Sequence, residues 1–210
     1  TGGTTTVGSM RIGDEGHGAL NVLGAGQLKV TNDPGNLFSI NVAHAVGSTG
    51  TVNVGGSGSL TASNRLTVGL GGDATFTQGG SSTVSVGGLR VANGATSTSS
   101  YTLNGGTLDV LSTAGVDGGT RIGISGTGTF NHNGGTHNTT FMQIGGATFG
   151  QGSGGTGVYN LNGGSLVSSG TISIRPNADS ASGALNVAGG SLSAPLIINN
   201  DQLNYSGGSI

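Results

Sequence analysis

The sequence contains no cysteine or tryptophan, and only 7% of its 210 residues are charged. Without cysteine, disulfide bridges, thiolate catalysis and a cysteine-based zinc site are excluded. Six basic residues against eight acidic ones give a formal net charge of -2, and the basic residues are scattered along the chain. Because nucleic acids and anionic membranes are recognised by clustered basic side chains, we expect neither as a partner.

Long apolar segments are also lacking. No apolar run approaches the roughly 20 residues that a membrane-spanning helix needs, so we expect no membrane insertion by this segment. No basic stretch followed by an apolar one opens the sequence, as it would in a signal peptide. The first residue is Thr1 rather than Met, and we therefore interpret the sequence as a processed or excised segment.

Glycine, in contrast, is abundant, with 47 residues. So much glycine without a strict three-residue period is typical of disordered, low-complexity chains. Such chains lack regularly spaced valine, isoleucine and leucine, which recur here at regular intervals. The pattern therefore favours an ordered structure.

One unit recurs through the sequence: a short apolar strand, an asparagine, a glycine pair and another short strand. Its clearest copies are Tyr-Thr-Leu-Asn-Gly-Gly-Thr-Leu at 101–108, Tyr-Asn-Leu-Asn-Gly-Gly-Ser-Leu at 159–166 and Leu-Asn-Val-Ala-Gly-Gly-Ser-Leu at 185–192. Repeats of 20 to 50 residues indicate a solenoid, in which each unit buries its apolar side against its neighbours.

Aligning the copies on their glycine turns predicts three short strands per coil and about eight coils. The first strands are Met10-Arg11-Ile12, Phe38-Ser39-Ile40, Leu66-Thr67-Val68, Leu89-Arg90-Val91, Thr120-Arg121-Ile122, Met142-Gln143-Ile144, Ile172-Ser173-Ile174 and Leu196-Ile197-Ile198. The second strands are centred on Asn21, Asn53, Thr77, Thr102, Asn131, Asn160, Asn186 and Asn204. The third strands are centred on Thr6, Lys29, Thr61, Ser85, Asp109, Asn138, Val167 and Ser193.

In most of these triplets apolar residues flank a polar middle residue, a period of two that turns the flanking side chains inward and the middle one outward. Strands with no helix between them predict an all-β fold, a right-handed parallel β-helix forming one domain over residues 1–210. Each coil adds about 4.8 Å, so eight coils predict a rod of roughly 38 Å.

The glycine pairs fall where the chain turns after the second strands, with Gly24-Ala25 in their place in the first coil, and glycine adopts positive φ there without steric cost. The connections between first and second strands vary most in length. The longer ones are 41–50, 92–100, 145–157 and 175–183. We expect these loops on one edge of the rod, where repeat proteins usually carry recognition sites.

At the Tyr-Asn-Leu-Asn-Gly-Gly-Ser-Leu and Met-Arg-Ile-Gly positions the chain resembles the glycine-rich, autotransporter-like repeats of large bacterial surface proteins, and repeats of secreted proteins with a PEP-CTERM sorting tail. The resemblance covers essentially every coil. It implies a secreted or cell-surface β-solenoid used as a stalk, adhesin, fibre or matrix component.

Candidate catalytic residues are few. The carboxylates fall in turns, apart from Asp109, and no two are placed by register as a pair on adjacent coils, as polysaccharide-cleaving β-helices require. Arg11, Arg90 and Arg121 share the outward first-strand face, the latter two on consecutive coils. We expect them to be solvated or packed against a partner, and Arg90 and Arg121 are the candidate ligand face for glycans.

Two histidines are the candidate metal ligands of this sequence. His132 and His137 flank a glycine corner at positions that are apolar in most coils, and two imidazoles can bind a metal. A third ligand is not evident, and buried, hydrogen-bonded histidines are commoner, so we predict no metal ligand and no cofactor. The glycine-aspartate strings 69–73 and 115–119 faintly resemble calcium-binding turns but lack their tandem period.

The outward column of Asn21, Asn53, Thr77, Thr102, Asn131, Asn160, Asn186 and Asn204 is the candidate assembly face. Side-chain amides stacked at the strand spacing can form a hydrogen-bonded ladder, and a flat uncharged face can also pack on another rod. No cap is recognisable at either end, so the segment is either part of a longer array or stacks head to tail.

We therefore expect a non-enzymatic, extracellular structural protein that builds a fibre, stalk or surface layer. Self-association is the expected partnership, with surface glycans as a further partner. The alternative is a carbohydrate-binding or polysaccharide-cleaving β-helix that uses the long-loop edge.

Overall fold

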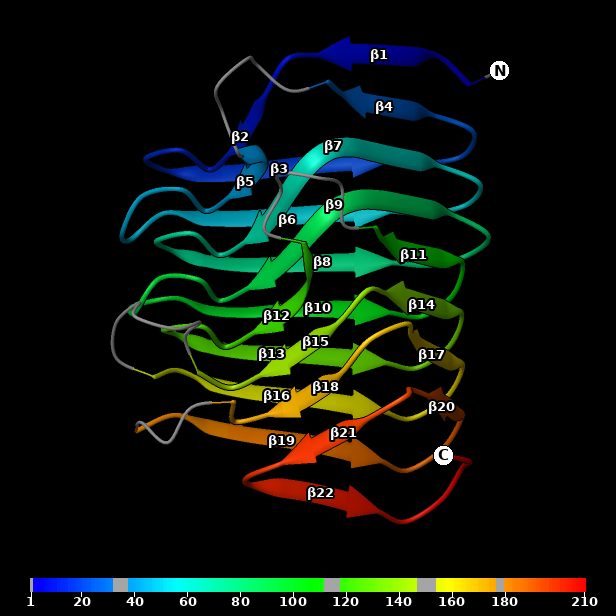
Figure 1. The fold of residues 1–210 in the computed structure, drawn as a ribbon. Helices are drawn as coiled ribbons and strands as arrows, with labels where there is room; N and C mark the ends of the chain where they lie inside the picture. The colour runs from blue at the N-terminus through cyan, green and yellow to red at the C-terminus, as the bar shows by residue number, and fades with distance from the viewer. Residues whose placement is uncertain (1, 32–37, 112–117, 147–153, 177–179) are drawn as a thin grey trace.

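A computed structural model describes residues 2–31, 38–111, 118–146, 154–176 and 180–210. All regular structure in these residues is β, and it forms one 14-stranded and one 8-stranded sheet, in which every strand pair is parallel. The chain winds through the two sheets coil by coil (Figure 1). The predicted parallel β-solenoid is confirmed. Within the described residues, no helix is long and apolar enough to cross a membrane.

The 8-stranded sheet contains one second strand from each of eight successive coils. Its members are β3 (His17–Val22), β6 (Thr49–Val54), β8 (Asp73–Gln78), β10 (Thr98–Leu103), β13 (Thr127–His132), β16 (Thr156–Leu161), β19 (Ser182–Val187) and β22 (Gln202–Tyr205). The predicted register holds throughout, because each central Asn or Thr lies opposite the next one. Most of these strands begin about one triplet earlier than the sequence predicted.

The 14-stranded sheet contains the first and third strands. The first strands are β2 (Met10–Ile12), β5 (Phe38–Val42), β12 (Gly119–Ile122), β15 (Met142–Ile144), β18 (Ile172–Ile174) and β21 (Ile197–Asn199). The third strands are β1 (Thr4–Val7), β4 (Gln27–Val30), β11 (Thr107–Val110), β14 (Thr136–Thr139), β17 (Ser165–Ser168) and β20 (Ser191–Ser193). In β7 (Ser59–Val68) and β9 (Thr83–Val91) a third strand runs directly into the next first strand, with a register irregularity where β7 and β9 pair.

Two predicted first strands were wrong in register. Asn41, not Ser39, pairs opposite Arg11, a slip of two residues that keeps the same faces and moves Asn41 from the predicted loop into β5. In the last coil Ile198 lies opposite Ser173, a slip of one residue. A one-residue slip exchanges the faces, and Ile198 is accordingly exposed on the outer surface.

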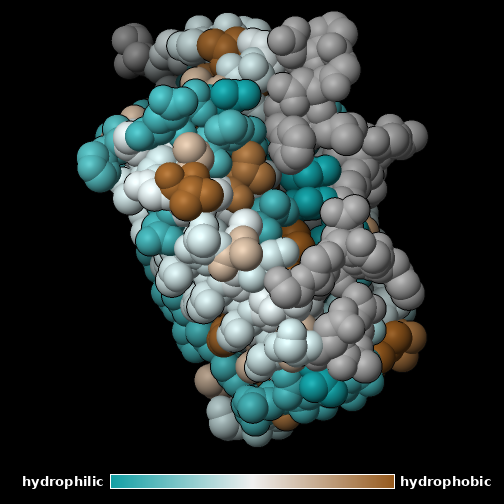
Figure 2. Space-filling model, turned by 90° about the vertical axis from the view of Figure 1, so that its left-hand side faces the viewer, coloured by the Kyte–Doolittle hydropathy of each residue, from teal (hydrophilic) through white to brown (hydrophobic). Residues whose placement is uncertain are grey.

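The path of the chain is right-handed. In Figure 1 the nearer strands run from right to left and the farther strands from left to right while the chain descends from the N-terminus. The connections between first and second strands lie on the left-hand edge of this view, as expected for the long-loop edge. Figure 2 faces that edge and shows separate apolar groups among polar and neutral residues.

The interior is filled by inward-facing columns of side chains. In the 8-stranded sheet, four aromatic rings from consecutive coils stack face to face, with ring centroids 4.5 Å apart for Phe76–Tyr101, 4.9 Å for Tyr101–Phe130 and 4.7 Å for Phe130–Tyr159. All four are essentially inaccessible to solvent. Each stacked pair stabilises the core by about 0.5–1.5 kcal/mol beyond its buried area.

The glycine corners behave as predicted. The positive-φ residues after the second strands are Gly24, Gly56, Gly80, Gly106, Gly135, Gly164, Gly190 and Gly208. A second corner was not predicted: the residue after each first strand also has positive φ in most coils. It is glycine in four coils but Ala43, Ala92 and Arg175 in three others, where the side chain makes this conformation costly.

Candidate functional site

The outward asparagine column of the 8-stranded sheet forms a hydrogen-bonded ladder. The Nδ2 of Asn160, Asn186 and Asn204 each donates to the Oδ1 of the asparagine one coil earlier, at 2.9, 2.7 and 2.7 Å. Asn53 donates to Asn21 in the same way, at 2.9 Å. All amides therefore point in one direction along the rod axis.

The ladder is interrupted where Thr77 and Thr102 replace asparagine, because a threonine side chain is too short to bridge to the next coil in this way. Beside the gap, the hydroxyls of Thr75 and Thr51 form a 3.3 Å hydrogen bond. The ladder thus has two parts, one over β3 and β6 and a longer one from β13 to β22.

A second ladder, which the sequence analysis missed, runs along the corner after the second strands. Asn162 donates to Asn133 and Asn133 donates to Asn104, both at 2.9 Å. Its signal in the sequence was the Asn directly before the glycine pair at these three positions. Together the ladders give this side of the rod a regular, amide-bearing and almost uncharged surface.

The arginine face differs from the prediction. Arg90 and Arg121 do lie opposite each other on neighbouring coils, but Arg121 is only 6% exposed. Its guanidinium lies 5.0 Å from the centre of the Phe141 ring, and its Nε donates to Gln143 Oε1 at 2.8 Å. Arg90 donates to Asn93 Oδ1 at 2.8 Å. Arg121 is therefore a packed side chain and does not present an open charge to a glycan.

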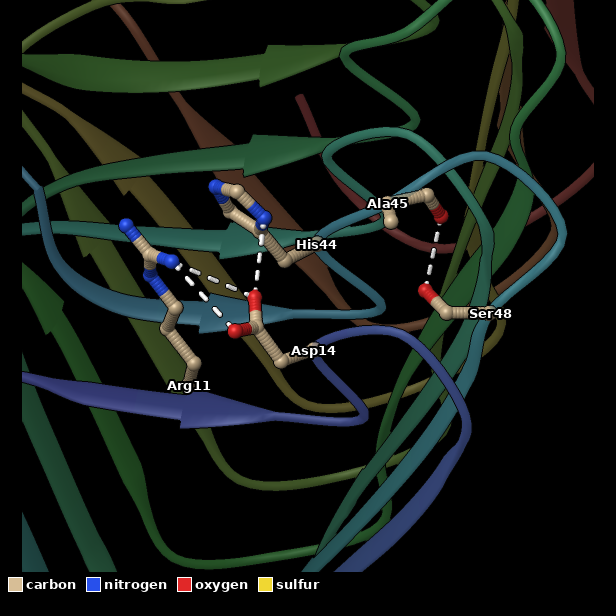
Figure 3. A network of polar contacts seen from close by, with 5 residues as sticks. All are labelled: Arg11, Asp14, His44, Ala45 and Ser48. Carbon is tan, nitrogen blue, oxygen red and sulfur yellow. Dashed lines mark hydrogen bonds and ion pairs between the residues drawn. The ribbon is translucent and has the colours of Figure 1, made fainter.

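One charged cluster was missed by the sequence analysis (Figure 3). Asp14 Oδ1 lies 3.3 Å from an Arg11 guanidinium nitrogen and 3.0 Å from His44 Nδ1. Asp14 and His44 are brought together because His44 and Ala45 donate backbone hydrogen bonds to the preceding coil, at Gly13 and Asp14. Thirty residues of sequence separate the two side chains, so no local motif could have revealed them.

This cluster orients an imidazole but does not complete a catalytic triad. A carboxylate beside Nδ1 fixes the ring as in hydrolases. The nearby Ser48 hydroxyl, however, is almost fully buried and donates to the Ala45 carbonyl at 2.7 Å, and in Figure 3 its dashed line runs to Ala45 and not to the ring. Asp14 pairs with Arg11 on its own coil and contacts His44 from the loop of the next coil, so the cluster joins two loops of the long-loop edge.

The long-loop edge also contains a cavity of about 280 Å³, lined by Val46, Gly47, Ser48, Thr49, Gly72, Asp73 and Thr96. Asp73 accepts the backbone N–H of Thr98 at 2.7 Å, and Thr49 Oγ1 lies 2.6 Å from His17 Nδ1. The lining supplies one carboxylate and several hydroxyls. The glycine string 69–73 thus uses its aspartate to bind backbone, while most of the string 115–119 lies outside the described residues.

His132 and His137 point into the rod and are inaccessible to solvent. Both Nδ1 atoms face the hydroxyl of Tyr159, at 2.8 and 3.1 Å. In the described part of the chain, no three His, Cys, Asp or Glu side chains are grouped as a metal site. The two histidines belong to a hydrogen-bonded network inside the core.

The same arrangement recurs two coils earlier without histidine. Gln78 occupies the column of His132, and Tyr101 from the following coil donates to its Oε1 at 2.6 Å. The Gln78 amide in turn donates to the carbonyl of Thr107 at 2.8 Å. Each core tyrosine therefore reaches back to a polar residue one coil earlier, a pairing that becomes visible only when the coils are stacked.

The fold defines the class of protein as an all-β parallel β-solenoid. In comparisons with known proteins, no family model, curated protein or solved structure matches the chain.

Proposed function

We propose that this chain is a non-enzymatic structural rod of the extracellular space or bacterial cell surface, which builds a fibre, stalk or surface layer. The observation that carries the proposal is the continuous axial pairing of the 8-stranded sheet: its second strands stack in one register over eight coils, and amide ladders run along its outer face. Axial hydrogen bonds resist extension and bending of the rod. The extracellular placement rests on the sequence resemblance alone.

Self-association end to end is supported by the two ends of the described chain. β3 and β22 are the edge strands of the 8-stranded sheet, and unpaired parallel edges pair readily with another strand. The ladder polarity also matches: it places the Nδ2 of Asn21 at one end and the Oδ1 of Asn204 at the other. A second copy stacked in register would continue the ladder.

Apolar groups at the ends support the same contact. In the last coil Tyr205, at an inward position of the edge strand β22, is 57% exposed, and Ile198, on the outer face of β21, is 41% exposed. The first coil contains a cavity of about 300 Å³, whose apolar lining includes Met10, Leu20, Val22 and Leu28. Contact between these two ends would bury apolar surface that is exposed to solvent in a single copy. A head-to-tail contact of this kind adds further copies without closing into a ring.

Sedimentation velocity tests this assembly. We expect the wild-type chain to form species larger than one copy as its concentration rises, and the Ile198→Lys/Tyr205→Lys variant to sediment as single copies. Val167→Lys is the matched control, because Val167 is similarly exposed, at 39%, on the side of the rod. A wild-type chain that sediments as a single copy at all concentrations contradicts the end-to-end proposal.

The long-loop cavity favours a second candidate, a carbohydrate-binding or polysaccharide-cleaving role. Its carboxylate and hydroxyl groups at Asp73, Thr49 and Thr96 are of the kind that bind sugar hydroxyls. Affinity electrophoresis in gels containing bacterial surface polysaccharides tests this role. Retardation that is lost in Asp73→Asn supports it, and equal mobility with and without polysaccharide contradicts it.

A further inference from the structure

The described core contains a buried cluster of titratable side chains, His132, His137 and Tyr159, which the structural role proposed above does not require. His132 lies between Leu103 and Leu161 in its column, and His137 lies between Leu108 and Leu166. Leucine therefore fills these positions in the neighbouring coils. Replacing it by two imidazoles costs desolvation that an apolar pair would avoid.

The cluster is a chain of six polar contacts. His132 Nε2 faces the Gly135 carbonyl at 3.2 Å, and both Nδ1 atoms face the Tyr159 hydroxyl. His137 Nε2 lies 3.0 Å from Thr120 Oγ1, which lies 3.1 Å from Thr139 Oγ1, and Thr139 donates to the Phe141 carbonyl at 2.8 Å. The chain ends in backbone carbonyls on both sides.

These contacts need one more hydrogen than the neutral groups supply. Two neutral imidazoles, one phenol and two threonine hydroxyls carry five hydrogens, whereas the network has six contacts. One contact must then set two lone pairs against each other, whichever way the hydrogens are arranged. The neutral network is consequently strained, and a sixth hydrogen would bring a charge into the core.

The surroundings oppose that charge. Burial, together with the smaller effect of the neighbouring His132, lowers the pKa of His137 to about 3. Burial also lowers the pKa of His132, against the raising effect of the carbonyls of Gly135 and Gly134.

No described carboxylate offsets this opposition. Inward-facing titratable groups from β10 and β16 are Tyr101 and Tyr159, whose pKa values burial raises. Arg121 of β12 and Asp109 of β11 lie on the outer face, where they contact Gln143 and Asn138.

We propose that the His132–Tyr159–His137 network is an acid-sensitive joint, which opens the middle of the solenoid in mildly acidic solution while the coils before it stay closed. The joint is independent of whether the rod assembles. In the opened state both imidazoles are in water and titrate near pH 6.5. The closed state, whose histidines have lowered pKa values, is fully stable only above that pH and loses stability as the pH falls below it.

The magnitude follows from proton linkage. The opening equilibrium constant rises up to tenfold per pH unit for each histidine that gains a proton on opening. For His137 this rise continues from about pH 6.5 toward pH 3. The opening equilibrium therefore shifts most steeply with pH if both histidines gain a proton on opening.

Hydrogen exchange measured by mass spectrometry between pH 7.5 and 4.5, corrected for the intrinsic exchange rate, tests the joint. We expect the opening constants of amides in β13, β14 and β16 to rise by roughly tenfold or more between pH 6.5 and 5, and those of β6 and β8 to change little. In the wild-type chain, protection of β13, β14 and β16 that does not change with pH is enough by itself to overturn the proposal.

His132→Gln/His137→Leu is the decisive variant, because the new glutamine can bind Tyr159 as Gln78 binds Tyr101. We expect it to lose the acid response. Gln78→Leu/Tyr101→Phe is the control, since it removes a buried polar pair of the same arrangement without a histidine, and it should keep the response in β13, β14 and β16. A variant without the two histidines that opens in acid as the wild type does contradicts the proposal.

Discussion

At the glycine corners, the backbone conformation and the close approach of the previous coil both require a residue without a side chain. The second glycine of each pair adopts positive φ, and its Cα also lies close to a carbonyl of the previous coil. A Cβ on Gly80, where φ is +69°, would lie 2.7 Å from the Gly56 carbonyl oxygen, whereas a Cβ on Gly79 would meet nothing closer than 3.8 Å. At this corner the first glycine therefore tolerates a side chain that the second does not.

We predict that Gly80→Ala lowers the free energy of unfolding by at least ~1–2 kcal/mol, the cost of a left-handed backbone with a side chain, with a further loss from the carbonyl contact. Gly79→Ala should be close to neutral. Urea unfolding followed by circular dichroism measures both variants against wild type. Equal midpoints for the two variants contradict this explanation.

The sequence revealed the glycine corners because the pairs recur visibly, but the buried polar partners could not be predicted. Gln78, His132 and His137 interrupt apolar columns, and the tyrosines that bind them come from the following coil. Likewise, Arg121 looked exposed because it points outward, whereas Phe141 and Gln143 pack over it.

At the scale of elements, the second strands were predicted in full register because the apolar-polar alternation and a following glycine turn, in most coils a glycine pair, anchor them. The first strands lack such an anchor. Phe38, Ile40 and Val42 continue the alternation, so a slip of two residues looks equally good, and the unbroken apolar run Leu196-Ile197-Ile198 has no alternation to fix its phase. The fusion of third and first strands in β7 and β9 depends on backbone bending, which the pattern does not encode.

The interrupted amide ladder leads to a prediction at this scale. Thr77→Asn/Thr102→Asn would place an amide in every coil and connect the two parts of the ladder. Each net hydrogen bond contributes about 0.5–1.5 kcal/mol, at the lower end for exposed groups, so we expect the urea midpoint to rise. Thr61→Asn is the control, because its neighbours Lys29 and Ser85 carry no amide. A ladder variant no more stable than this control would show that the ladder adds nothing to stability.

For the whole molecule, the stacking of eight coils makes a rod whose two edge strands carry matching ladder polarity. The amides on the lateral surface already form hydrogen bonds within one copy. The first and last described coils, in contrast, contain exposed apolar side chains and the edge strands of the sheets. The proposed end-to-end assembly therefore predicts growth along the axis, with ionic strength having little effect because few charges are involved.

Electron microscopy of the purified chain at neutral pH tests the structural account most directly. It predicts straight rods that exceed the roughly 38 Å expected of eight coils and grow with concentration, and that shorten to single copies in the Ile198→Lys/Tyr205→Lys variant. Dispersed single copies that bind or cleave a polysaccharide would contradict it.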